Sequence, residues 1–154
     1  MRKRALRNIL RRNLCNDDFA MPTFGTKSLS ALATCDARLQ RLAHEAIKLA
    51  NFTILEGHRG EAAQNAAYEK GLSKTRWPNG KHNATPALAF DFAPYPIDWT
   101  NRPVAIARFA FVAGVLWKCA ADLGIRIRFG WDWNRNLDPR DEVFLDWPHV
   151  ELDA

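Results

Sequence analysis

Apolar residues recur at helical spacing in several parts of the chain. A first helical pattern starts at Lys27, and a longer one covers 37–50, where Asp36 is suited to cap the N-terminus. Another helix is predicted over 61–70. The segment 103–123 has a proline in its first turn and is apolar nearly all round, so we expect it to be the buried central helix. A glycine follows each of the last two patterns and predicts where the helix ends.

Short apolar runs between these helices predict strands. They lie at 52–56, 88–93, 125–129 and 148–152. Residues 72–87 form a long polar loop, and a loop of this length favours a functional role over simple connection. Residues 130–147 form a second polar loop that carries tryptophans. The chain shows no repeats and no low-complexity linker. The pattern predicts an α+β fold, with a small antiparallel sheet packed against helices.

The length of 154 residues, 47% of them hydrophobic, suits one domain with a single core. The formal net charge is +5, but residues 1–20 carry six basic and two acidic side chains, which leaves only +1 for residues 21–154. This balance argues against a nucleic-acid-binding domain. The three cysteines are far apart and form no CxxC pair, so we expect free thiols and no disulfide framework.

The basic segment 2–14 allows three interpretations. It is a disordered tail, or an amphipathic segment that makes weak contact with an anionic membrane, or it is not translated because Met21 is the natural start. In each case we expect the domain to cover 21–154. Arginines interrupt any signal-peptide core, and the longest apolar stretch, 104–117, is short of the ~20 residues that span a bilayer.

Histidine and carboxylate residues provide the candidate chemistry. Of the four histidines, His44 falls within a predicted helix and suits a surface role, and His58 follows the end of a predicted strand. His82 lies in the long loop nine positions before Asp91, and His149 lies in the last predicted strand. Two histidines and one carboxylate make a zinc site that keeps a fourth position for water. Asp91 stands in an apolar run, where a carboxylate is costly to bury unless it is paired or binds metal.

Ordered motifs at matching intervals add a family resemblance over residues 21–152. They are Met-Pro-Thr-Phe-Gly at 21–25, Leu-Glu-Gly-His-Arg at 55–59 with Gln64, Trp-Pro-Asn-Gly-Lys-His at 77–82, the run from Ala89 to Trp99, Phe-Gly-Trp-Asp-Trp at 129–133, and the run from Asp146 to Leu152. On these motifs the chain resembles the phage endolysins that act as L-alanyl-D-glutamate endopeptidases. These enzymes are related to the zinc D,D-carboxypeptidases of vancomycin resistance, and the resemblance implies their Hedgehog/D,D-peptidase-like fold.

The resemblance implies a role for each matching residue. The zinc ligands are His82, Asp91 and His149. Asp146 is the catalytic acid–base, and Arg59 contacts the substrate and steadies developing negative charge. Gln64 is a supporting helix position beside the substrate.

Three other residues are expected near this site. Asp132 and Trp133 are expected to line the substrate cleft, although Asp132 equally suits a cap of the turn after Gly130. Glu151 is two residues beyond His149 and therefore faces the same side of a strand, where it suits a role in orienting that ligand.

The chain departs from the broader family's pattern in the loop before Asp91. Gly80 stands where that pattern has serine, and the interval of nine residues from His82 to Asp91 is longer than in that pattern. We expect the extra residues in 83–88 to be absorbed by the loop without moving either ligand.

The resemblance predicts a zinc-dependent peptidoglycan peptidase that cleaves the stem peptide and lyses bacteria. It would be a monomer, made in the host cytoplasm without a signal peptide and acting on periplasmic peptidoglycan after release. A D,D-carboxypeptidase or dipeptidase with the same zinc site is the nearest alternative. A non-catalytic wall-binding module and an inactive prophage remnant belong to a different class.

Overall fold

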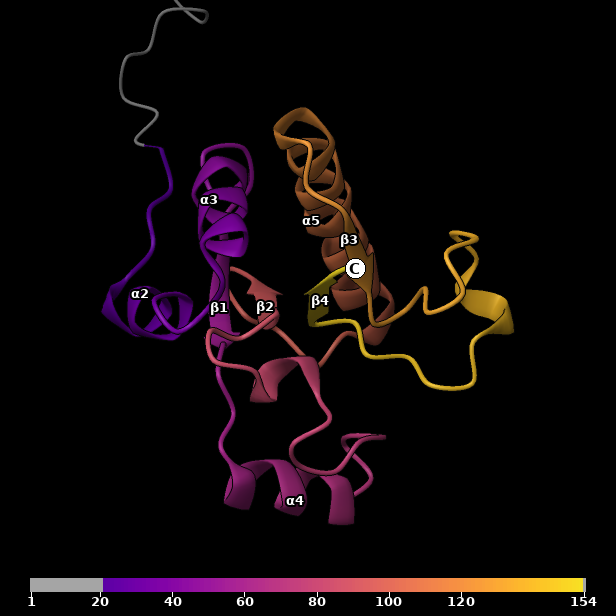
Figure 1. The fold of residues 1–154 in the computed structure, drawn as a ribbon. Coiled ribbons are helices and arrows are strands. Elements are labelled where there is room, and N and C mark those ends of the chain that lie inside the picture. The colour runs from indigo at the N-terminus through magenta and orange to yellow at the C-terminus, as the bar shows by residue number, and fades with distance from the viewer. Residues whose placement is uncertain (1–20, 154) are drawn as a thin grey trace, which may run out of the picture.

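The computed structural model describes residues 21–153, so the basic segment 2–14 and Cys15 lie outside the described residues. The helices are α2 (Thr26–Leu32), α3 (Ala37–Ala46), α4 (Glu61–Glu69) and α5 (Arg102–Leu123), and the strands are β1 (Phe52–Glu56), β2 (Ala89–Pro94), β3 (Ile127–Phe129) and β4 (His149–Leu152) (Figure 1). Short 3₁₀ turns lie at Lys81–Asn83 and Pro139–Asp141. Each expected helix and strand is present, with ends shifted by a few residues.

Two helix ends follow the predicted chemistry. The Asp36 side chain accepts a hydrogen bond from the backbone N–H of Arg38 and so caps α3. Gly124 ends α5 with φ of 65°, a left-handed conformation that suits glycine.

The four strands form one antiparallel sheet in the order β1-β2-β4-β3. Strand β4, the last strand in the described residues, therefore lies between β2 and β3. This arrangement confirms the predicted α+β fold with a small antiparallel sheet.

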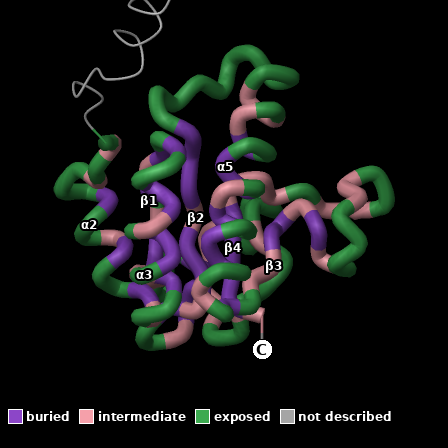
Figure 2. Tube along the Cα trace, turned by 90° about the horizontal axis from the view of Figure 1, so that it is seen from above, coloured by how far each residue is buried: buried purple, intermediate pink, exposed green. Residues whose placement is uncertain are grey.

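Side chains along the central strands β2 and β4 point alternately to the two faces of the sheet, one of which is the apolar core. Phe90 and Phe92 in β2 and Val150 and Leu152 in β4 are buried in the core, together with residues of α3 and α5. Figure 2 shows this buried layer running through the strands and the adjoining helices. Successive residues of a strand point to opposite faces, so Asp91 and its neighbours in β4 face away from this core.

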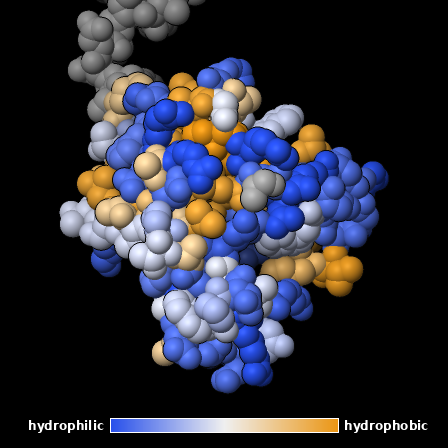
Figure 3. Space-filling model, in the orientation of Figure 1, coloured by the Kyte–Doolittle hydropathy of each residue, from blue (hydrophilic) through white to orange (hydrophobic). Residues whose placement is uncertain are grey.

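The expectation that α5 is buried all round is wrong. Phe109, Val112 and Leu116 pack in the core, but Phe111 is 63% exposed and Trp117 is 54% exposed. The helix therefore covers the sheet with one face only. Its outer face is apolar as well, so the spacing of apolar residues does not indicate which face is buried. Hydrophobic surface gathers in the upper part of Figure 3, where α3 and α5 lie.

By length and composition alone, helix α5 is long and apolar enough to cross a membrane. About a third of its most apolar segment is buried inside the domain. The helix is longer than the apolar stretch expected from the sequence. Its inner face packs against α3 and the sheet, so its apolar residues have a place in the domain core.

The Cys35 and Cys119 thiols are both free and buried, in agreement with the expectation for these two residues.

Phe92 is the central aromatic residue of the core. Its ring lies 6.1 Å from that of Phe52, 6.5 Å from that of Phe90 and 5.6 Å from that of Phe109. We expect Phe92→Ala to lower the free energy of unfolding by about 3–5 kcal/mol, because it leaves a cavity between three rings. The exposed Phe111→Ala should change it by less than about 0.5 kcal/mol. Denaturant unfolding of both variants measures the difference, and equal losses would contradict this account of the core.

Candidate metal centre

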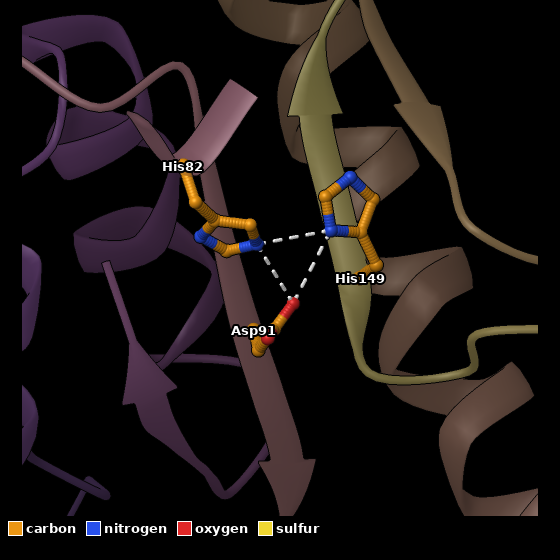
Figure 4. Close-up of side chains that lie close together, drawn as sticks. All are labelled: His82, Asp91 and His149. Atoms are coloured by element: carbon orange, nitrogen blue, oxygen red, sulfur yellow. Dashed lines mark hydrogen bonds and ion pairs between the residues drawn. The ribbon is translucent and has the colours of Figure 1, made fainter. Parts of the chain in front are cut away.

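Three ligand atoms from separate parts of the chain converge on one point. Asp91 comes from β2, His149 from β4 and His82 from the 3₁₀ turn (Figure 4). His82 Nε2 lies 3.2 Å from Asp91 Oδ1 and 3.1 Å from His149 Nδ1, and the last two atoms are 3.3 Å apart. Tetrahedral zinc with bonds of about 2.0–2.1 Å separates its ligand atoms by about 3.3 Å. The triangle therefore fits one face of a zinc coordination tetrahedron.

Both imidazole rings are held so that the correct nitrogen faces the triangle. His82 Nδ1 lies 2.7 Å from the Gly57 carbonyl oxygen, and His149 Nε2 lies 3.0 Å from Glu151 Oε2. When these outer nitrogens donate, His82 Nε2 and His149 Nδ1 carry the lone pairs that a metal needs. The structure thus places Glu151 in the orienting position that its spacing predicts.

The other oxygen of Glu151 is held in turn by an arginine. Arg128 Nε donates to Glu151 Oε1 over 3.1 Å, and the two residues are paired across β3 and β4. The Arg128 guanidinium also lies 5.3 Å from the centre of the Trp133 ring. A chain of contacts therefore runs from Arg128 through Glu151 to His149.

Asp91 is held on its second oxygen by Arg59. Arg59 Nη2 donates to Asp91 Oδ2 over 3.2 Å, and its Nε donates to Glu56 Oε2 over 2.8 Å. An irregularity in β1 brings Glu56, in place of Leu55, opposite Asp91 in the sheet. Arg59 therefore leaves Oδ1 of Asp91 free to face the two histidines.

The charges of the site are strongly coupled. Burial disfavours ionisation of Asp91, but hydrogen bonds from His149 and His82 outweigh it and hold the pKa of Asp91 well below its usual range. Burial likewise disfavours a charged His149 ring, but the Asp91 and Glu151 carboxylates raise the pKa of His149 to about 9. Without metal, His149 therefore carries a proton at neutral pH.

A cleft of about 450 Å³ opens beside the triangle. It has the size of a typical small-ligand or peptide site. Its lining includes His82 and His149, the predicted residues Arg59, Gln64, Trp133 and Asp146, and residues of the two long loops such as Lys74, Lys81 and Phe144. The segments 72–87 and 130–147, which the sequence singles out as loops, thus both contribute to its walls.

Asp146 is placed by a close backbone contact. Its N–H donates to the Gly130 carbonyl over 2.8 Å, and its carbonyl accepts from His149 N–H over 3.2 Å. A side chain at Gly130 would approach the Asp146 carbonyl oxygen to 2.5 Å, so this position requires glycine. Burial and the charge of Asp91 raise the pKa of the Asp146 carboxyl.

Gln64 lines the cleft as a buried support. Its Nε2 donates to the Thr75 carbonyl over 2.6 Å and to Ser73 Oγ over 2.9 Å. Its Oε1 accepts from Asn83 Nδ2 over 3.2 Å. Helix α4 is thereby tied to both ends of the loop that precedes β2.

The structure separates the two neighbours Asp132 and Trp133. Asp132 is 5% exposed and is absent from the cleft lining, and its carboxylate accepts from Leu137 N–H over 2.9 Å. This contact corresponds to the turn-capping interpretation. Trp133 does line the cleft, with its ring 5.5 Å from that of His149 and its Nε1 donating to the Phe144 carbonyl over 2.8 Å.

The remaining histidines lie apart from the triangle. His44 is exposed on α3, and the His58 ring lies edge-on to Trp77 outside the cleft lining. Sequence reasoning missed the supporting roles of Glu56, Gly57 and Arg128. The spacing from Glu56 to Arg59 hints at an ion pair, whereas nothing in the sequence marks the Gly57 carbonyl.

Comparison with known proteins identifies the family. A family model described as phage L-alanyl-D-glutamate peptidase matches residues 21–153. The chain belongs to this family of peptidases. The L-alanyl-D-glutamate peptidase of Escherichia phage T5 is 37% identical over 139 residues, which cover 84% of this chain and 96% of that protein.

A solved structure has a fold similar to that of this chain. The Serratia marcescens L-Ala D-Glu endopeptidase ChiX matches with a TM-score of 0.68 and 23% identity, over 90% of this chain and 96% of that chain. At this level of identity the likeness concerns the fold alone. The predicted zinc D,D-peptidase-like architecture agrees with it.

The raised pKa of His149 predicts that metal uptake releases a proton. A zinc ligand must be unprotonated, whereas His149 with a pKa of about 9 is protonated at pH 7. We expect zinc binding at pH 7 to release about one proton, and the zinc affinity to rise with pH up to about 9. Calorimetric titration in buffers of different ionisation enthalpy counts the protons. Proton-neutral binding at pH 7 would contradict the assigned protonation state.

Glu151 offers a test of how the ligand is held. We expect Glu151→Gln to weaken zinc binding by about 10- to 100-fold, because the neutral amide holds the His149 ring less firmly. Competition with a chromogenic chelator measures the affinity. The partly exposed Glu45 on α3 pairs with Lys48, so Glu45→Gln also replaces a paired carboxylate by an amide, but away from the site, and it should leave zinc affinity unaltered. An unchanged affinity in Glu151→Gln would show that the contact has no orienting effect.

Proposed function

We propose that this protein is a zinc-dependent peptidoglycan peptidase that hydrolyses the L-alanyl-D-glutamate bond of the stem peptide. The observation that carries the proposal is the triangle of His82, Asp91 and His149, which has zinc-ligand spacing, at the wall of a cleft that also contains Asp146. Membership of the phage L-alanyl-D-glutamate peptidase family supplies the bond.

The donor set suits hydrolysis of an amide. A zinc ion held by these three residues would lower the pKa of a bound water toward ~7 and polarise the carbonyl of the scissile bond. Asp146 would accept the proton of the attacking water on its carboxylate and deliver it to the departing amine of D-glutamate. Its raised pKa favours this exchange, because a carboxylate of ordinary acidity holds a proton less readily.

Arg59 contributes positive charge at the same wall of the cleft. Its guanidinium is fixed by Glu56 and Asp91, and its side chain is only 14% exposed. A fixed cation in a partly buried site stabilises the negative charge that develops on the carbonyl oxygen without first having to reorganise. Gln64 and Trp133 would shape the cleft around the peptide.

The proposed biological role is that of a phage endolysin. The relative in phage T5 carries the name L-alanyl-D-glutamate peptidase. We propose that this protein acts as a monomer on periplasmic peptidoglycan after release from the cytoplasm in which it is made. The near-neutral charge of residues 21–154 fits a cell-wall substrate and gives no support for nucleic acid as a partner.

Purified sacculi provide the direct test. The protein should lower their turbidity, a chelator should stop the reaction, and added zinc should restore it. Mass analysis of the products should find peptides that begin with D-glutamate. Release of single D-alanine residues would favour the D,D-carboxypeptidase alternative, and cleavage of glycan would contradict a peptidase of either kind.

Asp146→Asn separates catalysis from metal binding. We expect it to lower the rate of cleavage by about 10²- to 10⁴-fold, because an amide cannot take the proton of the attacking water. Zinc content should stay at the wild-type level. Asp122→Asn, on the exposed side of α5, is the matched control and should keep full activity. Full activity in Asp146→Asn would remove Asp146 from the mechanism.

A further inference from the structure

The proposed substrate carries a free carboxylate that a residue of the cleft must bind, in addition to the scissile bond at the metal centre. D-glutamate has two carboxyl groups, and its amino group forms the scissile bond with L-alanine. At most one carboxyl continues the peptide, so the other stays as a free carboxylate a few bonds from the scissile nitrogen. This inference rests on the proposed function, and it asks which residue receives that negative charge.

Four basic side chains line the cleft, and two of them are already neutralised. They are Arg59, Lys74, Lys81 and Arg128. Arg59 is paired with Glu56 and Asp91, and Arg128 is paired with Glu151. Arg59 is also assigned to the negative charge that develops on the scissile carbonyl oxygen, and Arg128 holds Glu151, so neither guanidinium is available for a second carboxylate. The two lysines therefore carry the available positive charge of this lining.

The two lysines differ in their surroundings. Lys74 Nζ lies 5.0 Å from the centre of the Phe144 ring, where the loop before β2 meets the loop before β4. Lys81 forms no ion pair with any residue in 21–153 and is partly buried. It also directly precedes His82, so its Cα lies one peptide unit from that of a residue in the metal triangle.

We propose that Lys81 binds the free carboxylate of the D-glutamyl residue and is a specificity-determining residue of this peptidase. The free carboxylate is close to the scissile nitrogen, so its partner must be close to the reacting centre. Among the unpaired cations of the lining, Lys81 is the one that shares the short 3₁₀ turn and the cleft wall with His82.

The backbone that carries Lys81 is fixed on both sides. The Lys81 carbonyl accepts from Leu88 N–H over 2.9 Å, and the His82 carbonyl accepts from Arg59 N–H over 2.9 Å. Gly80 N–H donates to Asn83 Oδ1 over 2.9 Å. A lysine on a fixed turn loses only side-chain freedom when it binds an anion, so its charge acts with little reorganisation of the cleft.

This assignment predicts that the enzyme distinguishes an acid from its amide. A carboxamide has nearly the shape of a carboxylate, but it lacks the charge that pairs with an ammonium group. Cell walls in which the free carboxylate of D-glutamate is amidated would therefore be poorer substrates than unamidated ones.

Two matched peptides test the proposal. One is L-alanyl-γ-D-glutamyl-L-lysine, and the other is the same peptide with the α-carboxylate of its D-glutamyl residue converted to a carboxamide. We expect the wild-type zinc enzyme to favour the acid by about 10- to 100-fold in kcat/KM, the range of one hydrogen bond to a charged group. In Lys81→Met this ratio should fall toward one, because kcat/KM falls for the acid peptide and stays unchanged for the carboxamide peptide.

Further variants locate the effect. Lys81→Arg should keep a preference for the acid, because it keeps the charge. Lys27→Met, an exposed lysine on α2 outside the cleft, should behave as wild type, and Lys74→Met should keep most of the preference. Zinc content and thermal unfolding of each variant show that the site is intact.

The outcomes separate this inference from the proposed function. Equal cleavage of both peptides by the wild type, or equal loss on both in Lys81→Met, would overturn the role of Lys81 and leave the proposed function standing. Loss of the preference in Lys74→Met alone would move the role to that lysine and overturn the assignment. Cleavage of neither peptide by the wild type would overturn both. If Lys81→Met does not fold, Lys81→Gln and Lys81→Arg decide on the same ratio.

Discussion

The pairing of Asp91 with His149 across β2 and β4 is the contact on which the site depends. The two residues are direct partners in the antiparallel ladder, so the backbone hydrogen bonds that hold the sheet also set the separation of two ligand atoms. A slip of one residue in this register would turn His149 into the core and Val150 into the cleft. Only His82 reaches the triangle from outside the sheet, and its turn is bonded to the backbone of Arg59.

Buried charge in the site is arranged as alternating pairs. Glu56, Arg59 and Asp91 form one series, and Arg128, Glu151 and His149 form another that meets it at the triangle. A buried charge without a partner costs several kcal/mol, whereas a fully paired network rigidifies its surroundings. The ligands are thus supported by ion pairs with residues that themselves line the cleft, such as Arg59, Arg128 and Glu151.

Local chemistry made much of the fold predictable. The strand 52–56, the Asp36 cap and the stop at Gly124 follow from apolar spacing and from single residues whose preferences act within one turn. The residue types and their spacing were enough to suggest a zinc site at His82, Asp91 and His149. The role of Asp146 could be predicted only from the ordered motifs of the family resemblance. Other features depend on contacts between distant segments, such as the irregularity in β1, the Gly57 carbonyl at His82 and the turn that takes up the Asp132 carboxylate. The one-sided burial of α5 was hidden because its exposed face is apolar too.

The cleft is built from two kinds of structure. Its floor, with His149 and Glu151, belongs to the sheet, while Lys74 and Phe144 come from two loops and contact each other. Strand residues are constrained by register and by the core that packs on the other face of the sheet, whereas loops accept insertions and exchanges at low cost. Substitutions in the loops can therefore change which cell-wall peptides the cleft accepts, while the metal ligands on the sheet stay in place.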